Sequence, residues 1–130
     1  MIMQLLAQVK QWAEEEPSVE SVILVGSYAR GMQSAESDVD FCIITREKEH
    51  LLQNQRFGER FGTVLKRQLE FYGKCTSVRV WYSTGLEAEF GIVDPSWIAL
   101  PLDAGTVEVL KGGYRVLVDK KGWFEGLILP

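Results

Sequence analysis

Two short apolar runs, each beside a small polar motif, constrain the fold of this 130-residue chain more than any other feature. Residues 20–25 form a run rich in β-branched side chains that stops at Gly26, a pattern typical of a buried strand ending in a tight turn. Residues 38–45 form a second strand, on which Asp38 and Asp40 share one face because side chains two apart point the same way. Since two carboxylates cannot lie in an ordinary apolar core, that face indicates a functional site.

The rest of the chain shows the periodicities of further helices and strands. Apolar residues three and four apart predict amphipathic helices, and two strand-like segments around a short glycine-containing turn predict an antiparallel hairpin. The predicted helices cover residues 2–15, 63–72 and about 104–110, and the predicted strands cover 20–25, 38–45, 78–82, 86–93 and 114–118. This mixture of helices and strands predicts an α/β (α+β) fold class.

Composition favours a single globular domain spanning residues 1–130. Hydrophobic residues make up 46% of the chain, which is enough for one core, and the length leaves little room for a second domain. The formal net charge of -4 gives no overall attraction to phosphate backbones, so we expect no broad nucleic-acid binding. A single nucleotide remains compatible with this charge, because one bound metal ion can outweigh distant, screened carboxylates.

Cysteine spacing and the N-terminal segment indicate the compartment. Cys42 and Cys75 lack the paired spacing of a zinc site or a redox motif, which predicts reduced thiols in the core. Residues 1–6 contain no basic segment before an apolar run, and no apolar stretch approaches the length of a membrane span. We therefore expect a cytoplasmic protein that does not associate with membranes.

The two motifs supply groups that a phosphate and a metal ion require. Gly26 has no side chain to obstruct a phosphate, and Ser27 would begin a helical turn whose free N–H groups can donate to it. Asp38 and Asp40 can converge on one hard, oxygen-seeking ion such as magnesium. Arg30, one turn into the same helix, is a further candidate for phosphate binding, with a structural ion pair as the alternative.

A third acid on a neighbouring strand would complete the site and accept a proton from a nucleophile. Glu87 and Glu89 share one face of the predicted hairpin, and we favour Glu89 because the apolar residues around it fix its direction. Glu87 lies nearer the turn, where solvation is expected. For Arg79, a cross-strand pair with a hairpin glutamate is favoured over a place in the site.

These motifs resemble the signature of the DNA polymerase β-like nucleotidyltransferase superfamily. The resemblance rests on residues 25–31, on ten residues between Ser27 and Asp38, and on the Asp-Val-Asp-Phe run that follows. Further stretches resemble small stand-alone bacterial members of that superfamily, namely residues 89–92, Trp97, residues 103–106 and residues 113–119. The resemblance implies a mixed β-sheet with helices mainly on one face. It also implies that Asp38, Asp40 and Glu89 bind magnesium, two ions when nucleotide is present, beside a triphosphate.

The resemblance further implies transfer of a nucleoside monophosphate, with ATP as the expected donor, to a hydroxyl group and release of pyrophosphate. Relatives that modify antibiotics or polymerise nucleotides carry a further domain for the acceptor. Here we expect the acceptor to be a small molecule or a partner protein, and a lone domain invites association with a partner or a second copy. Small relatives paired with a helical toxin make a toxin-like partner one candidate. The alternative is a non-catalytic nucleotide-binding or antitoxin module. Three acids favour catalysis, because a scaffold gains nothing by aiming carboxylates at one point.

Overall fold

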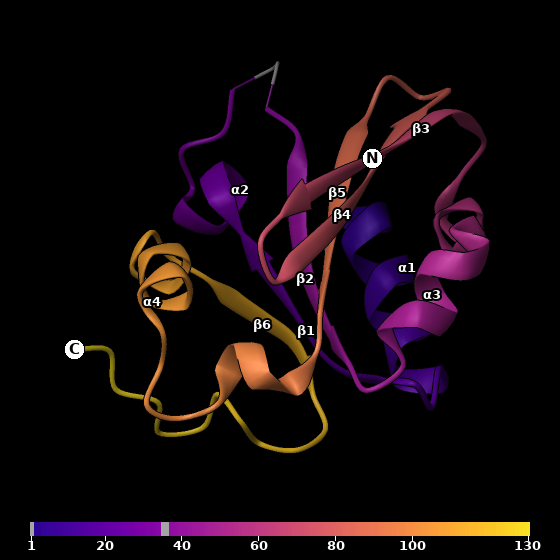
Figure 1. The fold of residues 1–130 in the computed structure, drawn as a ribbon. Helices are drawn as coiled ribbons and strands as arrows, with labels where there is room; N and C mark the ends of the chain where they lie inside the picture. Colours follow the sequence, from indigo (N-terminus) through magenta and orange to yellow (C-terminus); the bar gives the residue numbers. More distant parts are fainter. Residues whose placement is uncertain (1, 35–36) are drawn as a thin grey trace.

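A six-stranded mixed sheet forms the centre of the molecule, in a computed structural model that describes residues 2–34 and 37–130. Its strand order is β3-β4-β5-β2-β1-β6, in which β2 and β5 run parallel and the other neighbours run antiparallel (Figure 1). The strands are β1 Val19–Val25, β2 Val39–Thr45, β3 Val64–Tyr72, β4 Cys75–Tyr82, β5 Glu87–Val93 and β6 Arg115–Asp119. Met1 and two residues of the spacer between Ser27 and Asp38 lie outside the described residues.

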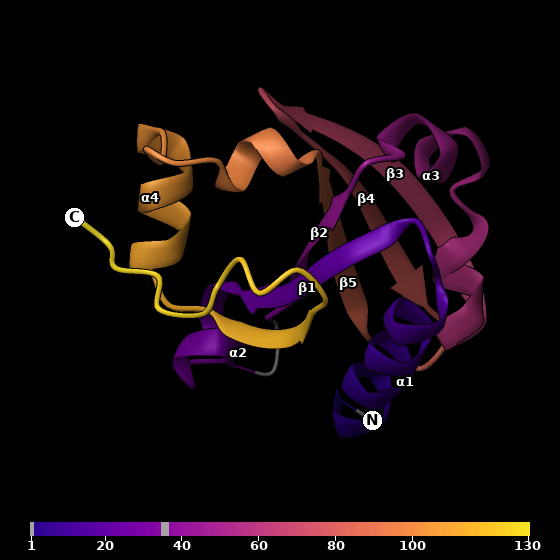
Figure 2. The same cartoon turned by 90° about the horizontal axis from the view of Figure 1, so that it is seen from below.

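Helices cover both faces of this sheet. Figure 2 shows α1 and α3 on one side of the sheet and α4 on the other. The helical elements are α1 Ile2–Glu15, α2 Gly26–Arg30, α3 Lys48–Asn54, η1 Arg56–Phe61, η2 Pro95–Ile98 and α4 Ala104–Lys111. Among the described residues, no helix combines the length and the apolar character that crossing a bilayer requires.

The larger core lies where α1, α3 and η1 pack against the sheet. Phe41 and Phe90, from the parallel strands β2 and β5, stack at its centre with ring centroids 5.2 Å apart. Trp12 of α1 closes this core by stacking on Phe57 at 5.4 Å. The burial of these aromatic side chains, together with the aliphatic residues around them, stabilises the sheet through the hydrophobic effect.

A smaller core occupies part of the opposite face, between the sheet, η2, α4 and the C-terminal segment. Its buried members are Ile23, Cys42, Ile44, Val93, Trp97, Ile98, Leu110 and Phe124. Because side chains alternate along a strand, this core shares its face of the sheet with the acidic residues at the start of β2. The smaller core does not cover the end of this face that carries the acidic residues, so that end is available for a site.

Most of the predicted elements are confirmed, and so is the mixed sheet with helices. The N-terminal helix, the strands at 20–25 and 38–45, the hairpin, the short helix near 104–110 and the final strand occur within a few residues of their predicted bounds. Both cysteines are free thiols, with Cys42 buried and Cys75 half-buried. These elements share strong local patterns, which explains why the sequence predicted them.

The predicted helix over residues 63–72 is wrong, because this segment forms the edge strand β3. In the sequence, Phe57 and Phe61 continue the helical spacing of the apolar residues in this segment, but they belong to η1 and pack in the larger core. The strand pairs with β4 along its length, through a two-residue turn at Gly73 and Lys74. Gly73 has a φ of 61°, which glycine adopts without strain. Pairing with β4 therefore overrides a helical periodicity that two separate elements produced together.

Replacing Ile92 by alanine should lower the free energy of unfolding by about 2–5 kcal/mol, because it empties a site in the larger core. The Ile92 side chain is fully buried on β5, whereas Ile128 is 87% exposed. The control Ile128→Ala should change the unfolding free energy by less than about 0.5 kcal/mol. Urea unfolding followed by circular dichroism measures both values, and equal effects at the two positions would contradict the described core.

Candidate active site

Three carboxylates converge at one end of the two parallel strands. Asp38 directly precedes β2, Asp40 lies in β2, and Glu89 lies opposite Asp40 in the register of β5. One oxygen from each of the three side chains lies within 4.8 Å of the others. All three residues are half-buried, so their charges are only partly screened by water. The structure thus brings together the three acids that the sequence singled out.

Gly26 allows the chain to turn beside Asp40. Val25 pairs with Asp40 across β1 and β2, and Gly26 then begins α2 with a φ of 73°. A Cβ atom at Gly26 would lie 2.3 Å from Oδ2 of Asp40, far inside van der Waals contact. Only glycine satisfies both the backbone angle and the space that this carboxylate occupies. The Gly-Ser motif and the Asp-Val-Asp motif are therefore in direct contact.

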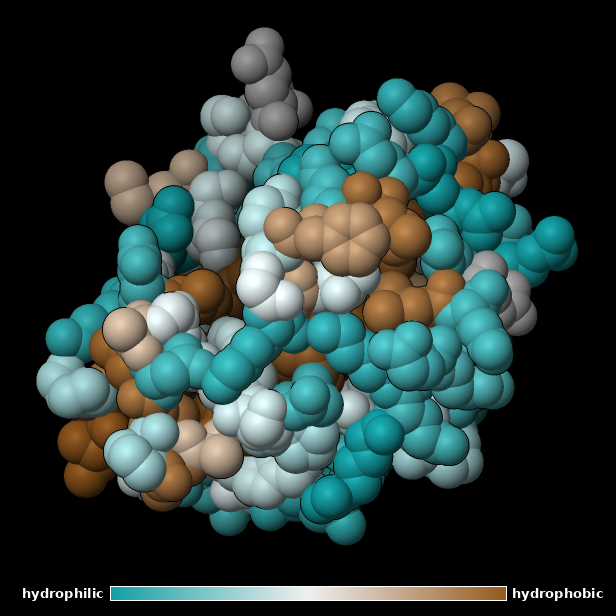
Figure 3. All heavy atoms as spheres, viewed as in Figure 1, coloured by the Kyte–Doolittle hydropathy of each residue, from teal (hydrophilic) through white to brown (hydrophobic). Residues whose placement is uncertain are grey.

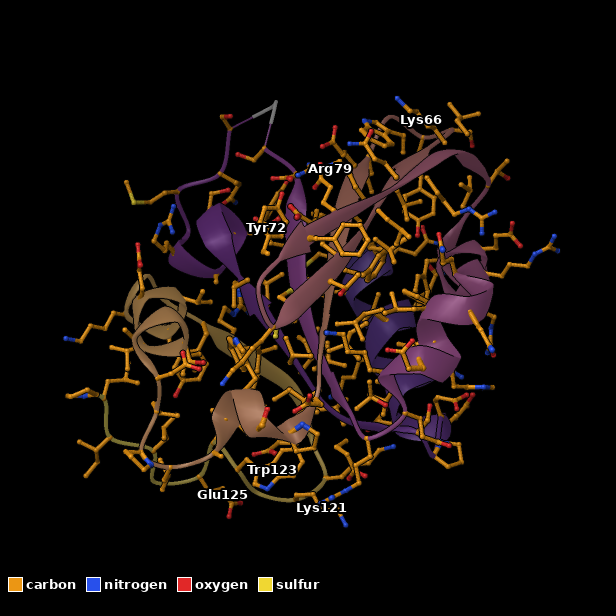
Figure 4. The ribbon with its side chains drawn as sticks, viewed as in Figure 1. Lys66, Tyr72, Arg79, Lys121, Trp123 and Glu125 are labelled. Atoms are coloured by element: carbon orange, nitrogen blue, oxygen red, sulfur yellow. The ribbon has the colours of Figure 1, made fainter. Side chains whose placement is uncertain are left out.

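Arg79 of β4, which is labelled in Figure 4, extends its guanidinium among the carboxylates. Its Nη1 lies 2.8 Å from Oδ2 of Asp38, and its Nη2 lies 2.9 Å from Oε2 of Glu89. The same guanidinium contacts Glu87 at 2.5 Å and Glu70 at 3.0 Å. The predicted pair with a hairpin glutamate is present, and Arg79 also has the less favoured place, beside the acids of the site.

Asp40 is the member of the three-carboxylate group that makes no ion pair with Arg79. The contacts of Arg79 with Asp38, Glu70, Glu87 and Glu89 do not extend to it. Burial, followed by the nearby charges of Asp38 and Glu89, raises the pKa of Asp40 from 3.8 to about 7. A cation placed among the three acids would stabilise the ionised form of Asp40 and so lower its pKa.

Further polar contacts fix the directions of the surrounding acids. The Ser77 hydroxyl donates to Oε1 of Glu89 at 2.9 Å, which leaves the other oxygen for Arg79. Glu70 accepts from Arg79 and from the hydroxyl of Tyr72, and the pKa of Glu70 is lowered chiefly by the first of these hydrogen bonds. Glu70 and Tyr72 were missed because their segment was predicted to be helical. The alternation of residues 66–72 before a Gly-Lys turn was the available signal.

A family model for the nucleotidyltransferase domain matches residues 3–88, which include Gly26, Ser27, Asp38 and Asp40. The chain belongs to the nucleotidyltransferase domain family. A comparison with curated protein sequences found no match.

Solved structures similar to this nucleotidyltransferase domain share its fold at low sequence identity. An aminoglycoside 6-adenyltransferase from Bacillus subtilis has a TM-score of 0.55 and 14% identity, over 73% of this chain and 34% of that protein. A cytoplasmic RNA terminal U-transferase has a TM-score of 0.52 and 14% identity, over 70% and 28%. Cid1 in complex with the UTP analog UMPNPP has a TM-score of 0.50 and 14% identity, over 70% and 29%. The chain thus spans about a third or less of each of these proteins.

A cleft of about 610 Å³ begins at the carboxylates of this nucleotidyltransferase domain and continues over the sheet. Its lining includes Asp40 and Glu89 of the three-carboxylate group, and Trp97 and Val109 from η2 and α4. Lys74 of the β3–β4 turn and Asp103 beside α4, whose side chains lie 3.2 Å apart, form an ion pair between its two walls. Figure 3 shows this face of the molecule, with apolar side chains visible in the hollow between α4 and the β3–β4 turn. The cleft therefore offers both charged and apolar side chains to a bound molecule.

Arg30 lies at the end of α2, where its described contacts are with the connection between α4 and β6. Its Nη1 is 3.5 Å from the carbonyl oxygen of Gly112, and its side chain packs against Gly113. Ser27 is half-buried in the first turn of α2, directly after the glycine that contacts Asp40. A phosphate-binding role for Gly26, Ser27 and Arg30 stays a prediction in this nucleotidyltransferase domain.

Replacing Asp40 by asparagine should stabilise the protein at pH 8 in EDTA. Because the pKa of Asp40 is raised from 3.8 to about 7 in the folded protein, protonation of Asp40 stabilises the folded state. This stabilisation is complete below about pH 3.8 and is lost as the pH rises through about 7. Asparagine removes the cost of the charge, so the advantage of the variant should shrink between pH 8 and pH 5. Urea unfolding at several pH values measures it. The control Asp94→Asn should give no such gain, because hydrogen bonds from Ser96 lower the pKa of Asp94.

Replacing Arg79 by methionine should lower the unfolding free energy in EDTA by about 3–5 kcal/mol, because it leaves several half-buried carboxylates without their cation. Magnesium should raise the melting temperature of this variant more than that of the unmodified protein. Arg115→Met, at an exposed position on β6, provides the control and should behave as the unmodified protein. An Arg79→Met variant that is fully stable in EDTA would show that Arg79 does not neutralise this site.

Proposed function

We propose that this chain is a magnesium-dependent nucleotidyltransferase, which transfers a nucleoside monophosphate, AMP from ATP, to a hydroxyl group and releases pyrophosphate. The observation that carries the proposal is the convergence of Asp38, Asp40 and Glu89 beside Gly26, with oxygen atoms within 4.8 Å of one another. Its membership of the nucleotidyltransferase domain family supports the class of reaction.

The three carboxylates fit a magnesium site by their donor type and their spacing. Magnesium prefers oxygen ligands, and carboxylates are the charged form of such ligands in proteins. Asp40 would gain most from the ion, since burial and neighbouring acids raise its pKa to about 7. When bound there, magnesium ions, two with the nucleotide, would neutralise charge at the phosphates and orient the attacking and leaving oxygens.

The protein side chains would position the reacting groups. The acceptor oxygen forms a bond to the α-phosphorus. At the same time the bond between the α-phosphorus and the oxygen that bridges it to the β-phosphorus breaks, and pyrophosphate leaves with the bonding electrons. Glu89 would take the hydroxyl proton, and the Ser77 hydroxyl at 2.9 Å would hold it in that direction. Gly26, Ser27 and Arg30 would hold the phosphates from the turn after β1.

The acceptor would approach through the cleft that opens at Asp40 and Glu89. Its volume of about 610 Å³ is in the range of small-molecule sites, and a side chain of a partner protein could enter it as well. A helical toxin-like protein is one partner of that kind. Two free cysteines are compatible with action in the cytoplasm, where thiols stay reduced and ATP and magnesium are available.

Magnesium and ATP together should raise the melting temperature of the protein, and Asp38→Asn combined with Asp40→Asn should abolish this shift. The two aspartates provide the ligands for the ion that holds the phosphates. Thermal unfolding with ATP alone, magnesium alone and both together separates the contributions. An unchanged shift in the double variant would show that the nucleotide binds elsewhere.

Transfer itself is tested by incubating the protein with α-labelled nucleoside triphosphates and a cell extract that contains proteins encoded beside it. We expect Glu89→Gln to lower labelling at least a hundredfold, because it removes the base and a metal ligand. Glu87→Gln is the matched control on the same strand face and should retain most of the activity, since Glu87 lies outside the three-carboxylate group. Nucleotide binding without labelling of any acceptor would favour the non-catalytic binding module.

A further inference from the structure

The edge strand β3 presents an open side with unusual exposure of apolar residues. It lies at the end of the sheet, with β4 as its single neighbour among the described strands. Phe71 is 74% exposed, Leu65 is 69% exposed and Leu69 is 37% exposed. The row of backbone N–H and C=O groups along such an edge can pair with another strand. An edge of nine residues is longer than the usual strand and is therefore a strong candidate for pairing.

The sequence of β3 complements itself when two copies run antiparallel. Paired residues must lie on the same face of the continued sheet, so a two-fold axis can pass only through a residue position. With the axis at Gln68, Lys66 of one copy faces Glu70 of the other, and Arg67 faces Leu69. Both Lys66–Glu70 pairs then bring opposite charges together, at the distance where cross-strand pairs stabilise a sheet.

The axes next to Gln68, and the axis at Glu70, do not match the charges in this way. An axis at Arg67 places Arg67 opposite Arg67 of the second copy, and an axis at Glu70 does the same for Glu70. Both arrangements bring like charges together. An axis at Leu69 avoids this repulsion but sets Lys66 against Tyr72, which forfeits both ion pairs. The arrangement centred on Gln68 is the one that matches charges and also covers part of the exposed apolar surface.

We propose that β3 is a self-association surface, on which a second copy of this chain pairs antiparallel through its own β3 about a two-fold axis at Gln68. The two six-stranded sheets become one continuous sheet. Leu69 and Phe71, on the face opposite to Glu70, are partly covered by the side chains of the second copy. This inference goes beyond the proposed activity and does not depend on it.

The pairing also reaches the candidate active site. Glu70 accepts hydrogen bonds from Arg79 and from Tyr72, and Gln68 donates to Glu70 at 3.2 Å. The ammonium group of Lys66 from the second copy would therefore join the charge network of the site at its outer side. A single pair of strands is a small interface, so the association is expected to depend on protein concentration.

Two variants at one position test the pairing and its register together. Because Leu69 faces Arg67 of the second copy, Leu69→Lys should give a monomer and Leu69→Glu should keep the dimer. Sedimentation velocity over a hundredfold range of concentration measures the association, and circular dichroism checks the fold of each variant. A register centred on Leu69 would instead make both variants monomeric, because each new charge would face its own copy. That result, or a wild-type protein that stays monomeric throughout, would overturn the proposal.

A cross-link tests the axis in a way that does not depend on charge. Gln68→Cys places two thiols opposite each other across the axis, so mild oxidation should convert most of the protein to a covalent dimer. Leu69→Cys should cross-link at least tenfold more slowly, and the unmodified protein with its native Cys42 and Cys75 gives the background. Equal cross-linking at positions 68 and 69 would also overturn the proposed register.

Discussion

The guanidinium of Arg79 lies among five carboxylates on one face of the sheet, so negative charge exceeds positive charge there. The arrangement of the strands and of the site depends on this excess of negative charge. Arg79 of β4 contacts Asp38, Glu70, Glu87 and Glu89, which come from the strands β3 and β5 and from the residue before β2. Removing any of these strands from the sheet would separate charges that are only partly exposed to water, at a cost that grows with burial. The Arg79 network therefore connects the order of the strands to the geometry of the site.

The position of Asp40 follows from the same imbalance. Arg79 approaches from β4, whereas Asp40 lies on β2, beside the turn at Gly26. Its carboxylate thus lies beyond the contacts of Arg79, although it is close enough to Asp38 and Glu89 to feel their charges. A site in which one carboxylate makes no ion pair and has a raised pKa suits a small divalent cation, because such an ion can contact all three acids at once.

Local patterns predicted the part of the site that lies on β1 and β2. The apolar run before Gly26 and the alternation after Asp38 each fall within one element, so nearby residues determine them. The same holds for the hairpin, which placed Glu89 on the correct face. The other half of the site depends on β3, whose identity as a strand comes from pairing with β4. Because this pairing is tertiary, Phe57, Phe61 and the strand residues together imitated a helix, and Glu70 was missed.

The contacts of Arg79 could be predicted only in part from the sequence of its own hairpin. Its cross-strand partner Glu89 could be predicted from the hairpin, because antiparallel register follows from the turn. Its contact with Asp38 depends on the parallel pairing of β2 and β5, which joins segments about fifty residues apart. The same guanidinium also reaches Glu70, and so links the candidate active site to the open edge of the sheet. A change in the charges along that edge therefore acts on the acids of the site through one side chain.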